Sequence, residues 1–79
     1  MPRFYFDLQD NDGLVIDDEG VELDMDAVQK EAAFTMADAV REKLRGPVTT
    51  GEIAVQVRDD IRKVMRFRVA IEMQIESKN

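Results

Sequence analysis

The sequence contains no cysteine, histidine or tryptophan among its 79 residues. Without cysteine there are no disulfides and no thiolate zinc sites, and without histidine the commonest general base is missing. The one serine, Ser77, lies near the C-terminus, and the acidic run Asp17-Asp18-Glu19 is typical of a solvated turn. We therefore predict no catalytic residues, no metal site and no cofactor, and we expect a protein that is not an enzyme.

Long apolar runs are missing as well. No stretch approaches the ~18 apolar residues that a membrane-spanning helix needs, and the opening Met1-Pro2-Arg3-Phe4 does not begin a signal peptide. A chain of this length is sufficient for one domain. We expect residues 1–79 to form a single cytoplasmic domain that does not associate with a membrane.

Positive charge is unevenly distributed along the chain. Residues 7–26 carry nine acidic side chains and no basic one, whereas residues 58–68 carry five basic side chains and two acidic ones. The formal net charge is −6. Such a balance disfavours nucleic acid as a partner, because the acidic segment repels phosphate.

The pattern of the first segment indicates a β-hairpin over residues 3–17. Apolar and polar residues alternate from Arg3, which is the period of a strand. Turn-forming residues follow at 10–13, and a short apolar run at 14–16 returns. The spacing then predicts a helix over 25–45, with Asp24 as its N-cap and Gly46-Pro47 as its stop.

Alternation resumes in a second hairpin over residues 52–76, and its last strand carries the longest period-two pattern in the chain. The predicted order is therefore ββαββ. This order favours an α+β two-layer sandwich, with an antiparallel four-stranded sheet and one helix on one face.

Residues 8–19, LQDNDGLVIDDE, also resemble a calcium-binding loop. In the EF-hand frame, Asp10, Asp12 and Glu19 fall at positions for oxygen ligands and Gly13 falls at the glycine position. The first position is Leu8, which cannot bind an ion, and strand patterns flank the loop where helices should be. We therefore interpret the stretch as the tip of the first hairpin.

Basic and aromatic residues on the sheet face opposite the helix are a second candidate site. Open sheets that bind single-stranded nucleic acid stack bases on aromatic side chains and hold phosphates with basic ones. One aromatic residue is available here, where such proteins commonly use two or three. The residues of this weaker candidate nucleic-acid face are Tyr5, Arg58, Arg66 and Arg68.

Two features favour self-association into a homodimer. A strand over residues 64–76 would span about 43 Å, whereas a compact domain of this length is only ~30 Å across. Such a strand must bend, or its distal half, residues 70–77, must pair outside its own hairpin, either with a second copy or with the first strand of the same sheet. The second feature is Phe34, which falls on the polar side of the helix. The candidate self-association residues are Phe34, Val69, Ile71, Met73 and Ile75.

The opening MPRFYFD, the turn Asp18-Glu19-Gly20 and the segment Val21-Glu22-Leu23 before an alanine-rich helix together resemble a family of small alphaproteobacterial proteins. That family is a domain of unknown function, so the resemblance implies no activity and no site residues. The strand–turn–helix layout is more loosely similar to HicB-type antitoxins, which is an analogy of fold alone.

The sequence favours a small non-enzymatic interaction module that forms homodimers. The alternative is a regulatory protein of antitoxin-like layout that binds nucleic acid or a toxin partner.

Overall fold

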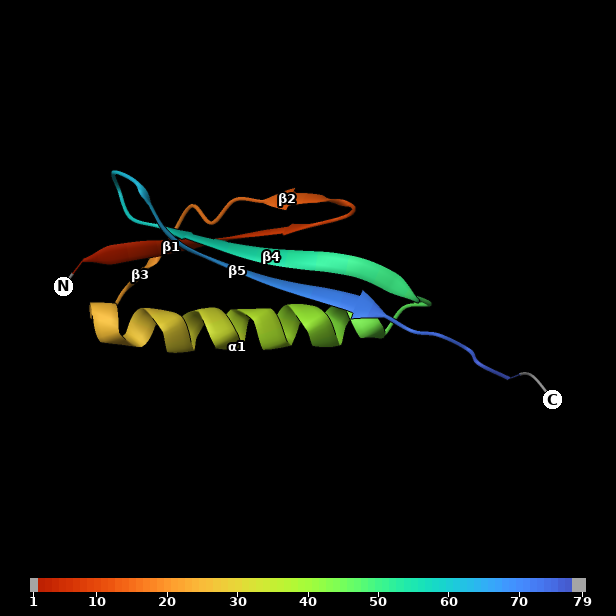
Figure 1. The fold of residues 1–79 in the computed structure, drawn as a ribbon. Coiled ribbons are helices and arrows are strands. Elements are labelled where there is room, and N and C mark those ends of the chain that lie inside the picture. Colours follow the sequence, from red (N-terminus) through yellow and green to blue (C-terminus); the bar gives the residue numbers. More distant parts are fainter. Residues whose placement is uncertain (1, 78–79) are drawn as a thin grey trace.

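The computed structural model describes residues 2–77, which form one helix packed on one face of a five-stranded antiparallel sheet (Figure 1). The α+β prediction is therefore confirmed. The elements, in chain order, are β1 (Arg3–Asp10), β2 (Gly13–Val15), β3 (Val21–Glu22), α1 (Met25–Leu44), β4 (Thr50–Arg58) and β5 (Lys63–Glu72).

Strand β1 pairs with three of the other strands. It pairs with β4 on one side, and on the other side it pairs with β3 near its start and with β2 near its end. The sheet order is β2-β1-β4-β5, so β5 is an edge strand with β4 as its single neighbour. The two-residue strand β3 is the fifth strand, which the four-stranded prediction lacked.

The core lies between the sheet and α1. Its largest fully buried side chains are Phe4 from β1 and Ile53, Val55 and Val57 from β4. The helix contributes Val28, Ala32 and Met36, whose spacing of four places them on one side of the helix. The strand alternation and the helical spacing in the sequence predict that these residues lie on the faces turned toward the core.

Local residues explain where the helix begins and ends. Asp24 is the N-cap in an extended conformation, as predicted, although its side chain makes no capping hydrogen bond. Its carbonyl oxygen instead accepts a hydrogen bond from the N–H of Ala27 at 2.9 Å. At the other end the helix stops at Leu44, just before Gly46-Pro47, because proline cannot continue it.

The second hairpin differs from its prediction at both ends. Strand β4 begins at Thr50 rather than residue 52, and β5 ends at Glu72 rather than residue 76. Val69 and Ile71 are paired with Ile53 and Gly51 of the same chain, so the expectation that residues 70–77 pair outside their own hairpin is wrong for residues 70–72. Met73 still donates a hydrogen bond to the carbonyl of Thr49 at 2.7 Å.

Beyond Met73 the chain leaves the end of the sheet (Figure 1), because β4 begins at Thr50 and has no further residues with which the chain could pair. The described residues are elongated, with extents of 57 × 23 × 18 Å. An elongated body has room for a ten-residue strand, and this removes the length conflict on which the prediction rested.

Candidate functional site

The polar interactions of the sheet concentrate on its open face, opposite the helix. Asp7 of β1 is only 6% exposed although it is ionisable. Arg58 of β4 neutralises it with two hydrogen bonds, Nε to Oδ2 at 2.8 Å and Nη2 to Oδ1 at 3.4 Å. The same guanidinium donates to the carbonyl oxygen of Asp17 at 2.9 Å. Arg58 therefore ties the segment after β2 to the centre of the sheet.

Asp17 fills the gap between β2 and β3. Its carboxylate accepts hydrogen bonds from the N–H groups of Phe6, Glu19 and Gly20 at 3.0–3.1 Å. Its own N–H donates to Oδ1 of Asp7 at 2.9 Å. Here a carboxylate takes the place of a missing strand partner, which is why β1 can pair with two short strands in different registers.

Burial alone would raise the pKa of Asp17. The N–H donors of Gly20, Phe6 and Glu19, together with the nearby Arg58 guanidinium, outweigh burial and lower that pKa below its usual value. A lowered pKa in the folded state stabilises the protein above the unfolded-state pKa of about 4. This stabilisation is lost as the pH falls through the folded-state pKa.

We expect Asp17→Asn to lower the free energy of unfolding at pH 7 by about 1–3 kcal/mol, because an amide cannot accept all three hydrogen bonds. The loss should be smaller at pH 3, because the carboxyl group of the unfolded chain, with its pKa of about 4, is largely protonated there. Urea unfolding at both pH values measures the difference, and Asp18→Asn, at an exposed neighbour, is the matched control. An Asp17→Asn variant with the wild-type dependence on pH contradicts the assignment.

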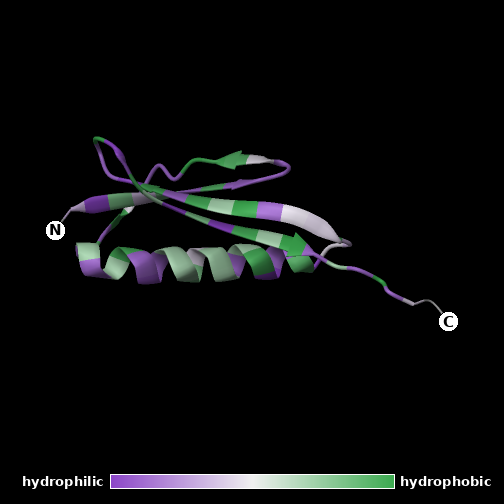
Figure 2. Ribbon diagram, viewed as in Figure 1, coloured by the Kyte–Doolittle hydropathy of each residue, from purple (hydrophilic) through white to green (hydrophobic). Residues whose placement is uncertain are grey.

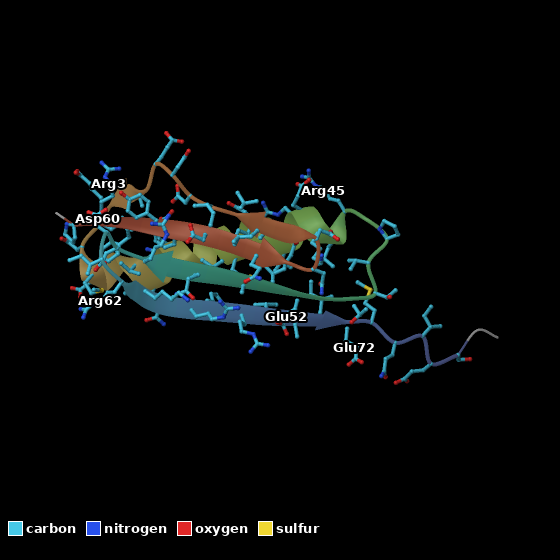
Figure 3. The ribbon with its side chains drawn as sticks, turned by 90° about the horizontal axis from the view of Figure 1, so that it is seen from above. Arg3, Arg45, Glu52, Asp60, Arg62 and Glu72 are labelled. Carbon is cyan, nitrogen blue, oxygen red and sulfur yellow. The ribbon has the colours of Figure 1, made fainter. Side chains whose placement is uncertain are left out.

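Tyr5 completes the network. The Arg58 guanidinium lies over its ring, 4.5 Å from the ring centre, and its hydroxyl donates to Asp60 at 3.1 Å. The hydrogen bond to Asp60 raises the pKa of Tyr5. Gly20 lies next to the Tyr5 ring and has a φ of 71°. A side chain at position 20 would collide with that ring. Figure 3 shows Asp60 and Arg3 together at this end of the sheet.

The arrangement joins the two hairpins through hydrogen bonds between β1, β4 and the segment after β2. Within residues 2–77, every buried side-chain nitrogen or oxygen has a hydrogen-bond partner. We therefore interpret this Tyr5–Asp7–Asp17–Arg58 network as structural. Sequence reasoning missed it, because the pairing of Asp7 with Arg58 depends on the β1–β4 register.

The four residues of the candidate nucleic-acid face do lie on the open face, but three of them are engaged. Tyr5 and Arg58 belong to the network, and Arg68 forms an ion pair with Glu52 at 2.7 Å. Arg66 is exposed and makes one long hydrogen bond to Gln56 at 3.4 Å. The face therefore offers one arginine without a carboxylate partner, which is weak support for phosphate binding.

The calcium-like stretch is a hairpin tip, as interpreted. Asp10 pairs with Gly13 across the turn, and its Oδ1 accepts the N–H groups of Asp12 and Gly13 at 2.8 and 3.1 Å. Glu19 lies beyond β2, where its N–H bonds to Asp17. Across residues 2–77, no group of three acidic side chains is arranged to hold a metal ion.

The candidate self-association residues fall into three places. Val69 and Ile71 are half-buried on the helix side of β5 and pack against the core. Met73 and Ile75 are exposed in the segment after β5, at 53% and 74%. Phe34 is exposed on the helix surface away from the sheet, where Lys30 lies 5.9 Å from its ring centre.

A groove of about 640 Å³ separates the tip of the first hairpin from the C-terminal end of α1. Its lining includes Leu8 and Asp10 of β1 with Ala39 and Glu42 of α1. Its lining also includes the hairpin tip at Asn11 and the start of β4 at Thr50, so this flank of α1 faces β1 and the start of β4. In the view from above, Arg45 at the end of α1 lies on the β2 side of the sheet, away from Glu72 at the end of β5 (Figure 3).

Comparison with known protein families matches residues 3–71 to the domain of unknown function DUF6894. The chain belongs to this family. Tyr5, Asp7 and Gly20 belong to the segments that carried the resemblance in the sequence, and they lie in or against the polar network. No curated protein and no solved structure matches the chain. No helix within residues 2–77 is both long and apolar enough to cross a membrane.

Proposed function

We propose that this DUF6894 protein is a non-enzymatic interaction module that forms a homodimer through the free edge of β5. The proposal includes the cytoplasmic, alphaproteobacterial setting that the sequence suggests. The observation that carries it is β5, an edge strand of ten residues that is apolar on its helix side and, within residues 2–77, has no neighbouring strand on one edge.

The free edge of β5 presents unpaired peptide groups in a regular row. The N–H of Met73 points toward β4, where it bonds to Thr49. In an antiparallel strand the peptide groups alternate in direction. The N–H and C=O groups of Arg66, Arg68, Ala70 and Glu72 therefore point outward, ready to pair with another strand.

An apolar surface lies under this edge. Phe67, Val69 and Ile71 are only half-buried, because α1 crosses the sheet diagonally and its end lies beneath β1 and β2 (Figures 1 and 3). With Glu42 on the flank toward β1, helical spacing places Ala37 and Leu44 on the flank toward β5. Figure 2 shows apolar residues along the end of α1 and of β5. A second copy paired along β5 would cover the apolar residues of β5 and those at the end of α1.

Charge selects the register of such a pair. In a two-fold antiparallel arrangement centred on Val69, Arg66 of each copy lies opposite Glu72 of the second copy, and Phe67 lies opposite Ile71. A centre at Arg68 would place two arginines opposite each other, which is destabilising. Arg66 and Glu72 have no ion-pair partner among the described residues, so the Val69 register pairs the two charges that the single chain leaves over.

We expect Arg66→Glu to weaken the dimer at least about ten-fold, because two facing acidic pairs replace two attractive ones. Glu72→Arg should weaken it similarly, and the double variant Arg66→Glu/Glu72→Arg should restore it. Sedimentation at micromolar concentration measures the mass against twice the 9.0 kDa of one chain. A wild-type chain that stays monomeric overturns the proposal, and a double variant without recovery overturns the register.

Ala70→Pro tests the edge pairing separately. It removes an outward N–H from each copy while the bonds to β4, made by the odd-numbered residues, remain. Loss of two hydrogen bonds at about 1 kcal/mol each should weaken the dimer by roughly ten- to thirty-fold. Ala70→Thr keeps the N–H and serves as the control. Equal dimerisation of both variants would show that the edge is not the interface.

The alternative, a regulatory protein that binds nucleic acid or a toxin partner, draws support from Arg66 alone on the open face. Binding of single-stranded or duplex oligonucleotides that weakens with added salt and is lost in Arg66→Ala would favour it.

A further inference from the structure

We propose that the exposed edge of β2 is a docking site for an extended protein segment with aliphatic residues at its centre and lysine or arginine at both ends. This inference is independent of the β5 dimer, which uses the opposite edge of the sheet. The partner would add a strand beside β2, a mode of recognition in which backbone hydrogen bonds give affinity and side chains give specificity.

The β2 edge is apolar and uncovered. Leu14, Val15 and Ile16 are consecutive, and they are 57%, 66% and 54% exposed. Edge strands are normally protected from pairing by lysine, proline or a covering segment. The segment from Gly13 to Ile16 contains neither lysine nor proline and its apolar side chains are uncovered, so the shortness of β2, three residues, is the protection that it has.

The backbone of β2 is oriented for strand addition. The N–H of Phe6 points toward β2 and β3, where it bonds to Asp17. By alternation, Leu8 of β1 faces the same way and forms its hydrogen-bonded pair with Val15. The N–H and C=O of Leu14 therefore point away from β1, toward the open edge.

Charge indicates the chemistry of the partner. Asp12 lies at one end of the apolar edge, and Asp18 and Glu19 lie beyond the other; all three are exposed. Residues 7–26 contain no basic side chain to neutralise them. Basic residues at both ends of an added strand would meet these acids, whereas nucleic acid would be repelled.

A second copy fits this edge less well. If β2 paired with its own symmetry mate about Leu14, Asp12 at one end of each copy would be brought toward Asp18 and Glu19 of the other with no basic side chain between them, and like charges brought together are destabilising. If β2 instead took β5 of another copy, pairing would be head-to-tail and would continue without closing. Such assembly would give masses well above twice the 9.0 kDa of one chain.

The test is titration of the full chain with the acetylated peptide KKVTVTVKK, followed by amide hydrogen exchange. We expect the Leu14 amide to exchange at least about ten-fold more slowly at saturation, while the Ala70 amide is unchanged. The matching peptide EEVTVTVEE should not bind. Protection at Ala70 instead of Leu14, or equal binding of both peptides, overturns the proposal.

Leu14→Pro removes the outward N–H without touching the bonds to β1, which are made by Gly13 and Val15. We expect it to weaken peptide binding at least about ten-fold, whereas Leu14→Thr, which keeps the N–H, should stay within about three-fold of wild type. Unchanged binding by Leu14→Pro, or growth of the wild-type chain into open-ended assemblies, contradicts the inference. Ala70→Pro, which disrupts the proposed dimer edge on β5, should bind the peptide as wild type does. A result against the dimer can therefore be told apart from a result against peptide binding at β2.

Discussion

Arg58→Met should unfold more readily than wild type by about 3 kcal/mol, the lower end of the cost of breaking a buried ion pair, since Arg58 is partly exposed. The substitution leaves Asp7 buried, with its side chain 8% exposed and no guanidinium beside it. It also removes the donor to the Asp17 carbonyl. Domains of this size are stable by only roughly 4–12 kcal/mol, so the variant should lose a large part of its stability.

Denaturant unfolding measures this loss, and Arg41→Met is the control, because the Arg41 side chain is 70% exposed and its ion pair with Asp38 is 3.8 Å long. The control should change stability by less than about 0.5 kcal/mol. The double variant Asp7→Leu/Arg58→Met should recover part of the loss, since no unpaired charge remains buried. Recovery should be incomplete because the N–H of Asp17 loses its acceptor. An Arg58→Met variant as stable as the Arg41→Met control would refute the role of the network.

Gly20→Ala should destabilise the fold by about 2–4 kcal/mol, the sum of left-handed backbone strain and a steric clash. Gly20 has a φ of 71°, which residues with a side chain rarely adopt. A Cβ there would lie 2.8 Å from Cε2 of Tyr5 and 2.9 Å from the carbonyl oxygen of Phe4. Neither neighbour can retreat easily, because Phe4 is paired with Val21 and the Tyr5 ring lies under Arg58.

Gly13→Ala is the matched control for this prediction. Gly13 has no atom within 4 Å of the position of a Cβ and does not have a positive φ. We expect that variant to be neutral or more stable by up to about 1 kcal/mol, because alanine restricts the unfolded chain. Thermal unfolding compares the two variants. Similar melting temperatures for Gly20→Ala and Gly13→Ala would show that the contact with Tyr5 is not tight.

Short-range patterns predicted the elements well. The hairpin tip at Asp10 and Gly13, the helix start at Asp24 and the apolar alternation of β4 all depend on neighbours within a few residues, and each is confirmed. The same patterns failed at the ends of the second hairpin. Whether Thr50 or Ile75 joins a strand depends on a partner strand, and the last strand ends where β4 has no further residue to pair with it.

The candidate site was predicted only in part. Tyr5 and Arg58 were placed correctly on one face, but their engagement with Asp60 and Asp7 was not foreseen. Val69 and Ile71 were expected to be free for a partner and are instead half-buried. The exposed run Leu14–Ile16 looked like an ordinary returning strand, because alternation does not reveal which edge of a sheet remains uncovered.

By itself the sequence determined the α+β class, the order of the hairpins and helix, and the separation of an acidic segment at residues 7–26 from a basic segment at residues 58–68. These properties follow from residue type and local spacing, which do not depend on contacts between distant parts of the chain. The tertiary structure decided which charges meet, where β5 ends and which strand edges stay open. Those outcomes depend on the register between strands distant in sequence and on the diagonal path of α1 across the sheet, and no local pattern encodes either.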